Sequence, residues 1–259
     1  MSDINVAEHW IDTQHGALFA QDWVPRAVQG VPIILLHDSL GCVALWRDFP
    51  EQLAATTGHR VIAYDRLGFG RSSARSGRLA RGFVEEEAVQ GFAALRQQLG
   101  IVDFIVFGHS VGGGMAVACA ATHAQHCQAL IIESAQAFAE DLTLQGIRDA
   151  DQQFAVPGQL QRLSRYHGDK AEWVLRAWVD TWLSEAFADW SLDPLLPGVR
   201  CPMLSLHGEQ DEFGSVAHPR RFTALTNGPS VMRLLPGCGH VPHREQAEVV
   251  LAEVQRFLG

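Results

Sequence analysis

The chain has 259 residues, of which 47% are hydrophobic and 19% are charged, so it can bury a large core and extended disorder is excluded. Its formal net charge of −9 and its lack of a basic run argue against nucleic acid or an anionic membrane as a partner. The 5 cysteines form no C-x-x-C pair, and no apolar run reaches the ~18 residues needed to span a bilayer. We therefore expect a reduced, cytoplasmic protein without a signal peptide.

Short apolar runs alternate along the chain with longer helical patterns, which predicts a mostly parallel sheet connected by crossover helices. A turn-like Gln-His-Gly at residues 14–16 predicts an N-terminal β-hairpin. The predicted elements are the hairpin over residues 9–20, strands at 31–37, 60–65, 104–107, 129–132, 201–207 and 231–235, and helices at 50–57, 83–99, 115–121 and 244–258.

The alternation stops between residues 134 and 198, where the pattern is helical and holds four of the 7 tryptophans. We predict an α/β core formed by residues 1–133 and 199–259, with a helical cap inserted at 134–198. Insertions of this kind tend to lie where loops converge on a site. The tryptophans either pack within the cap or line an apolar acyl or ring pocket; they are Trp173, Trp178, Trp182 and Trp190.

The pattern Gly-His-Ser-Val-Gly stands between the apolar run 104–107 and a helix of small residues. This strand–turn–helix arrangement is typical of a nucleophile elbow, with Ser110 in a tight turn. Side chains two positions away on either side would collide there, so Gly108 and Gly112 are expected for steric reasons. The alternative is that this segment is an ordinary glycine-rich turn before a helix, without a catalytic role.

A serine hydroxyl needs a base to take its proton. His240 fits this role, because two glycines and two prolines around it predict a fixed loop after the last strand. His243 is the alternative, and we expect it to begin the final helix at the surface instead. The pairs His123/His126 and His240/His243 have no well-placed third ligand, so we expect no metal site and no cofactor.

An acidic side chain should orient the imidazole, and it should precede the histidine in the chain. Asp211 is the candidate, since it follows the strand at 201–207 and catalytic groups collect at the carboxyl ends of parallel strands. Glu133, at the end of the strand before the cap, is the second candidate. Glu209 and Glu212 are expected to be solvated loop residues.

The tetrahedral intermediate of acyl transfer needs two N–H donors for its oxyanion. One would be the backbone N–H of Val111, directly after the serine. The other should come from the loop that follows the strand ending at His37.

At this point the chain resembles the α/β-hydrolase superfamily, in its serine hydrolase branch with a small helical cap. The resemblance rests on five segments of the sequence, which are residues 36–46 with His37 and Trp46, residues 64–72, 108–112 and 208–211, and the pair Gly239-His240. It covers nearly the whole chain and implies the α/β-hydrolase fold. It also implies that Ser39 gives the second oxyanion N–H, with Leu40 as the alternative. The family usually has His-Gly where this chain has His37-Asp38, so Asp38 could change the loop or place a carboxylate at the pocket rim.

Five arginines between residues 66 and 81 form the densest basic stretch, and we expect a solvated loop there, the alternative being attraction of an anionic substrate group. Asp65 and Arg66 are expected to form a structural pair.

These features predict a serine hydrolase that acts on a small carboxylic ester or lactone through an acyl-enzyme on Ser110. One alternative is a hydrolase of carbon–carbon bonds beside a ketone, as in aromatic degradation. Another is a ligand-binding protein with vestigial hydrolysis, and a third activity could be a cofactor-free perhydrolase reaction. The sequence does not define the acyl or alcohol specificity, the pathway or the oligomeric state.

Overall fold

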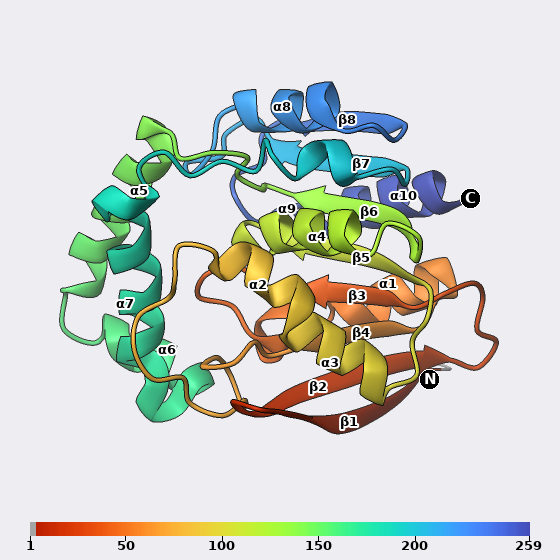
Figure 1. Cartoon of the computed structure of the whole chain (residues 1–259), viewed down its shortest axis with the longest axis horizontal. Coiled ribbons are helices and arrows are strands. Elements are labelled where there is room, and N and C mark those ends of the chain that lie inside the picture. Colours follow the sequence, from red (N-terminus) through yellow and green to blue (C-terminus); the bar gives the residue numbers. More distant parts are fainter. Residues whose placement is uncertain (1–3) are drawn as a thin grey trace.

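A computed structural model describes residues 4–259, and a single eight-stranded sheet forms its centre (Figure 1). The strand order is β1-β2-β4-β3-β5-β6-β7-β8, and every neighbouring pair from β4 to β8 is parallel. The predicted mostly parallel sheet is therefore confirmed. The strands are β1 Ile4–Thr13, β2 Gly16–Pro25, β3 Ile33–Leu36, β4 Val61–Tyr64, β5 Phe104–His109, β6 Cys127–Glu133, β7 Met203–Gly208 and β8 Ser230–Leu235.

Helices cover both faces of the sheet, which explains why β3, β4 and β5 are buried at every position. One core cluster joins the sheet to α2 and α4, and the other joins its opposite face to α1 and α10. The helices are α1 Phe49–Thr57, α2 Phe83–Val89, α3 Gly91–Gln98, α4 Val111–Thr122, α5 Asp141–Phe154, α6 Gln159–His167, α7 Ala171–Trp182, α8 Ala217–Leu225, α9 Pro242–Glu245 and α10 Ala247–Leu258.

Two predicted helices are each broken in two, and the prediction of continuous helices at 83–99 and 244–258 was wrong. Gln90 leaves the helical region (φ −109°, ψ −94°), and α3 turns to run beside β1, where Gln98 exchanges two hydrogen bonds with the Asp12 backbone. Gln246 interrupts the second helix at φ −139°. The pattern also missed α8.

The segment 134–198 contains α5, α6, α7 and short 3₁₀ turns, and it lies to one side of the sheet in Figure 1. Its aromatic side chains form a cluster, with Phe187 stacked on Trp190 at 5.0 Å between ring centroids. Helices α5 and α7 face the carboxyl ends of β3 and β5, because their side chains share a cavity with Ser110. Among the helices of residues 4–259, none combines the length and apolar character that a bilayer crossing requires.

Candidate active site

Ser110 lies between β5 and α4 with a left-handed backbone (φ 56°, ψ −127°), which is a strained conformation for a residue with a side chain. A Cβ at Gly108 would stand 2.1 Å from the Gly112 carbonyl oxygen, and one at Gly112 would stand 2.2 Å from the Leu36 carbonyl oxygen. Both separations are impossible contacts, so only glycine allows β5, the turn and α4 to approach this closely.

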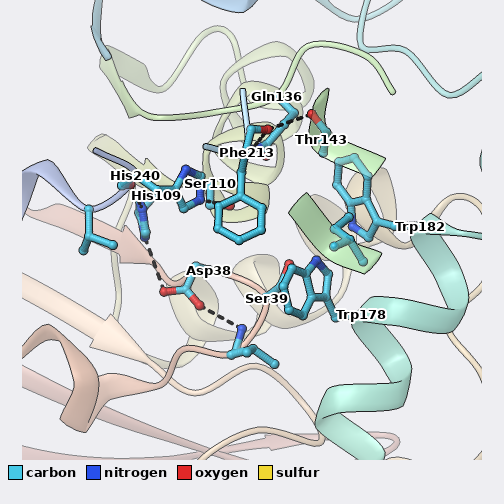
Figure 2. A pocket seen from close by; sticks show the side chains of 13 residues that line it. Asp38, Ser39, His109, Ser110, Gln136, Thr143, Trp178, Trp182, Phe213 and His240 are labelled. Atoms are coloured by element: carbon cyan, nitrogen blue, oxygen red, sulfur yellow. Dashed lines mark hydrogen bonds and ion pairs between the residues drawn. The ribbon is translucent and has the colours of Figure 1, made fainter. Parts of the chain in front are cut away.

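Three side chains expected at the site, Ser110, His240 and Asp211, form a hydrogen-bonded chain. Figure 2 shows its first two members, Ser110 and His240. His240 Nε2 lies 3.0 Å from Ser110 Oγ, and His240 Nδ1 lies 2.8 Å from Asp211 Oδ1. Because a carboxylate only accepts, Nδ1 carries the hydrogen and Nε2 is left to accept from the serine hydroxyl. This tautomer is the one that a general base for Ser110 requires.

Asp211 is held in place where the chain leaves β7. Its Oδ1 also accepts a hydrogen bond of 2.8 Å from the Phe213 N–H. Burial would raise the pKa of this carboxyl, but the hydrogen bond and charge of His240 outweigh it and lower the pKa of Asp211 below its ordinary value. Asp211 is therefore ionised at neutral pH and can stabilise a protonated His240.

The loop that carries His240 is fixed from two sides. The Glu245 carboxylate accepts from the Gly239 N–H at 2.6 Å and from the Val241 N–H at 2.9 Å. This turn explains why the predicted final helix breaks at Gln246. From the other side, the His109 ring donates through Nε2 to the His240 carbonyl at 2.8 Å.

The expected oxyanion donors, Ser39 and Val111, line one small cavity together with Trp178 and Trp182. Among the hydrogen bonds of residues 4–259, neither backbone N–H has a protein acceptor. The Leu40 N–H, by contrast, donates to Asp38 Oδ1 at 2.8 Å. The Leu40 N–H, the alternative oxyanion donor, is therefore already hydrogen-bonded to Asp38. This favours the N–H groups of Ser39 and Val111 as the pair that an oxyanion could accept from.

Ser110 is only 8% exposed, and it opens onto a cavity of about 170 Å³ beneath α5 and α7. The surface that the walls expose is mostly apolar, although seven of the thirteen lining residues have polar side chains (Figure 2). The lining residues are Asp38, Ser39, Leu40, His109, Ser110, Gln136, Thr143, Ile147, Trp178, Trp182, Phe213, His240 and Val241.

A family model described as alpha/beta hydrolase fold matches residues 31–180, which is more than half of the chain. The chain belongs to this family. A non-heme haloperoxidase of Rhodococcus erythropolis is 24% identical over 272 residues, which cover 93% of this chain and 95% of that protein. Other curated relatives match over only about a third of their own length.

Two solved structures share the fold of this chain over nearly its whole length. A thermophilic esterase from Thermogutta terrifontis has a TM-score of 0.73 at 22% identity, over 97% of this chain and 98% of that one. The enol-lactonase from Burkholderia xenovorans LB400 has a TM-score of 0.74 at 20% identity, over 96% and 99%. The family resemblance and the fold expected from the sequence are therefore confirmed.

This α/β-hydrolase fold places a second acid–histidine pair beside the first. Glu133, at the end of β6, lies 2.5 Å from His243 Nδ1, and both side chains are at most 3% exposed. The expectation that His243 is a surface residue was wrong, because α9 turns it inward against Trp46 and Phe49. Glu133 is not part of the hydrogen-bonded chain that ends at Ser110.

His109, Glu133 and His243 are the group whose ligand atoms come closest to a metal site in the described chain, all lying within 4.8 Å of one another. Three of the four ring nitrogens already face oxygen atoms of the protein, however. His243 Nδ1 is on Glu133, while His109 faces the His240 carbonyl and Asp38. The cluster therefore fits a hydrogen-bonded network better than a metal site.

Of the four cap tryptophans, Trp178 and Trp182 line the cavity, whereas Trp173 packs on Phe69 and Trp190 stacks on Phe187. Five lining residues do not follow from the sequence patterns. Phe213 and Val241 could have been found from their positions close to Asp211 and His240, but no spacing singles out the three from residues 134–198; the five are Gln136, Thr143, Ile147, Phe213 and Val241.

None of the five arginines at 66–81 lines the Ser110 cavity, but the expectation of a solvated loop is wrong for Arg66, which is buried and lines the small cavity of Ser39 and Val111. Arg71 pairs with Glu8, and Arg81 pairs with Asp189. Asp65 and Arg66 are structural but do not form the expected pair. Asp65 accepts from the N–H groups of Val43 and Arg71, whereas the Arg66 guanidinium donates to the Asp38 carbonyl.

Proposed function

We propose that the protein is a serine hydrolase that cleaves a small carboxylic ester or lactone through an acyl-enzyme on Ser110. The observation that carries the proposal is the Ser110–His240–Asp211 chain of hydrogen bonds, 3.0 Å and 2.8 Å long, opening into an apolar cavity. A nucleophile, a base and a group that orients the base are the parts that acyl transfer requires.

The reaction would proceed in two halves. In the first, Ser110 Oγ attacks the carbonyl carbon while His240 Nε2 takes its proton, and the Ser39 and Val111 N–H groups stabilise the oxyanion. Collapse breaks the bond to the alcohol oxygen, which takes the proton from His240. In the second, water gives a proton to His240 and attacks the acyl-enzyme, which releases the acid and restores the Ser110 hydroxyl. In a lactone the alcohol stays attached to the acid.

The cavity supports a small substrate. An apolar cavity of roughly 150 Å³ holds one benzene molecule, so about 170 Å³ has room for one ring or a short acyl chain. Trp178, Trp182 and Ile147 give this space an apolar wall. We therefore expect a compact, uncharged acyl group in preference to a long fatty acid.

The first test is hydrolysis of p-nitrophenyl esters from acetate to dodecanoate by the wild type and by Ser110→Ala. We expect an optimum among short chains and a loss of at least ~10³-fold in kcat/KM in the variant. Ser164→Ala is the matched control, because its hydroxyl bonds only to Leu160 within α6. Full turnover by a folded Ser110→Ala protein would refute the proposal.

The similarity to a haloperoxidase over 93% of the chain favours a second candidate activity. If hydrogen peroxide replaces water in the second half-reaction, the acyl-enzyme yields a peracid, and Ser110 regains its proton. Halogenation of a dye precursor with peroxide, bromide and a short carboxylic acid would reveal this activity. It should depend on Ser110 as ester hydrolysis does.

A further inference from the structure

Asp38 follows His37 in the loop after β3, and its side chain contacts its own loop and the end of β5. Its Oδ1 accepts from the Leu40 N–H at 2.8 Å, and its Oδ2 lies 3.3 Å from His109 Nδ1. Gly41 makes room for it, since a Cβ at Gly41 would come within 3.0 Å of Asp38 Oδ2. The side chain is 27% exposed and borders the cavity, so its carboxylate is neither free nor fully buried.

His109, the residue before the nucleophile, has an oxygen atom beside each ring nitrogen. Nε2 donates to the His240 carbonyl oxygen at 2.8 Å, and Nδ1 lies 3.3 Å from Asp38 Oδ2, at ion-pair distance but without the alignment of a hydrogen bond. A carbonyl and a carboxylate can only accept hydrogen bonds, so each ring nitrogen must carry a hydrogen to be attracted rather than repelled. An imidazole with both hydrogens is the positively charged imidazolium.

The surroundings of His109 favour a positive charge. Two carboxylates face it, Asp38 from the loop after β3 and Glu133 from the end of β6. The rings of His240 and His243 lie 5.1 Å and 5.0 Å from its ring centroid, and the Arg66 guanidinium is turned to the Asp38 carbonyl. Although burial alone would lower the pKa of His109, the nearby charges of Asp38 and Glu133 raise it above its ordinary value.

We propose that His109 is held as a buried imidazolium that joins the oxyanion loop, through Asp38, to the loop of the catalytic base, through the His240 carbonyl. This inference rests on the proposed function, because it assigns His109 and Asp38 as positioning residues for Ser110 and His240. Neither residue exchanges a proton with substrate. Their role is to hold the Ser39 N–H and the His240 ring in the correct positions relative to Ser110 Oγ. A displacement of about 1 Å between reacting groups can lower the rate ~100-fold.

The charge of His109 can be measured without any substrate. Nitrogen-15 NMR of the wild type should show both His109 ring nitrogens protonated at pH 7, and the signals should titrate above the pH at which a free histidine does. Assignment comes from His109→Gln, which lacks them. A neutral His109 ring at pH 7 would overturn the inference.

The positioning role is tested with Asp38→Asn, which keeps an oxygen for the Leu40 N–H but removes the charge. We expect kcat to fall about 10- to 100-fold with KM within about threefold, since the geometry of the reacting groups changes more than binding does. The alkaline limb of the kcat profile should also move down by about 1–2 pH units, because an opposite charge at this range shifts a pKa by that amount.

Asp103→Asn is the matched control, since Asp103 and His126 form an exposed pair at 3.0 Å. It should change neither kcat nor the pH profile. An Asp38→Asn enzyme with kcat within threefold of the wild type and an unmoved alkaline limb would overturn the positioning role. If the wild type hydrolyses no ester, the proposed function fails, but NMR of the wild type still tests the charge of His109. If Asp38→Asn does not fold, the same NMR measurement of the wild type tests the inference.

Discussion

Two acid–histidine pairs stand side by side in this molecule, and they differ in what they face. Asp211–His240 and Glu133–His243 each join the end of a sheet strand to the same short segment, with separations of 2.8 Å and 2.5 Å. His240 has Ser110 Oγ at 3.0 Å and is part of the cavity wall, whereas His243 is enclosed by Trp46 and Phe49.

The difference shows that a carboxylate beside a histidine does not by itself define a catalytic pair. Burial lowers the pKa of His243 and would raise that of Glu133, but the charge and hydrogen bond of His243 bring the pKa of Glu133 below its ordinary value. With no nucleophile at hand, we assign this second pair to holding the His240 loop against β6. Substitutions in the two pairs should therefore affect different properties.

The largest effect should come from Asp211→Asn. The amide keeps the shape of the side chain but removes the charge that stabilises a protonated His240, and it can present its NH₂ group to Nδ1 and favour the wrong tautomer. We expect kcat/KM to fall by about 10³–10⁴-fold while the denaturation midpoint changes little. Glu209→Gln, in the same loop but exposed, is the control. An equally active Asp211→Asn enzyme would show that the pair has no special role.

Glu133→Gln should lower the stability of the protein more than its activity. The amide still reaches His243 Nδ1 but carries no charge, so a charge-assisted hydrogen bond becomes a neutral one, which costs about 1–3 kcal/mol of unfolding free energy. The folded protein should lose far less activity than Asp211→Asn, because Glu133 acts on the site only through the charge of His109 and the position of the His240 loop. Urea denaturation, with turnover measured below the transition, separates the two quantities. If activity is lost without loss of stability, Glu133 belongs to the catalytic machinery instead.

Acidification should destabilise the fold, because several buried groups are held in their deprotonated form. Burial lowers the pKa of His37 and His243, so below about pH 6.5 the unfolded chain binds protons that the folded chain does not. Each such histidine removes at most about 1.4 kcal/mol per pH unit in that range. The raised pKa of His109 acts in the opposite direction. The midpoint in urea should fall from pH 7 to pH 5, and a rising midpoint would contradict this balance.

The smallest effect should be a change of chain-length preference in Trp178→Ala. Removing an indole from the cavity wall enlarges the space beside Ser110, so the ester optimum should move to longer acyl chains. A pocket change of this kind is worth about 1–3 kcal/mol, or roughly 10- to 200-fold in the ratio of kcat/KM values. Trp173→Ala, in the same helix but packed on Phe69, should leave the optimum unchanged. If the preferred acyl chain length is unchanged in both variants, the acyl chain does not bind against Trp178.

The sheet and the three hydrogen-bonded residues Ser110, His240 and Asp211 could be predicted because local patterns encode them. Continuous apolar runs marked the buried strands, and glycines on both sides of Ser110 marked a turn that tolerates no side chains. The cavity wall could not be predicted in the same way. Thr143 and Ile147 reach the cavity through the packing of α5, and that packing depends on residues far apart in the chain.

Asp38 and His243 show a second limit. The sequence marked Asp38 as unusual, but its partners lie on different elements, Leu40 in its own loop and His109 at the end of β5. His243 was expected at the surface because it begins a helix, but it is buried, with Nδ1 2.5 Å from Glu133 and its ring against Trp46 and Phe49. Tertiary hydrogen bonds decided both cases.

The central claim is that His240, oriented by Asp211, activates Ser110 to form an acyl-enzyme. Mass spectrometry of protein quenched with acid during turnover of p-nitrophenyl acetate tests it directly. We predict one added acetyl group, located by peptide mapping on Ser110 and absent from His240→Ala quenched at the same time. An acetyl group on another residue, or turnover with no adduct under any quench time, would contradict the account.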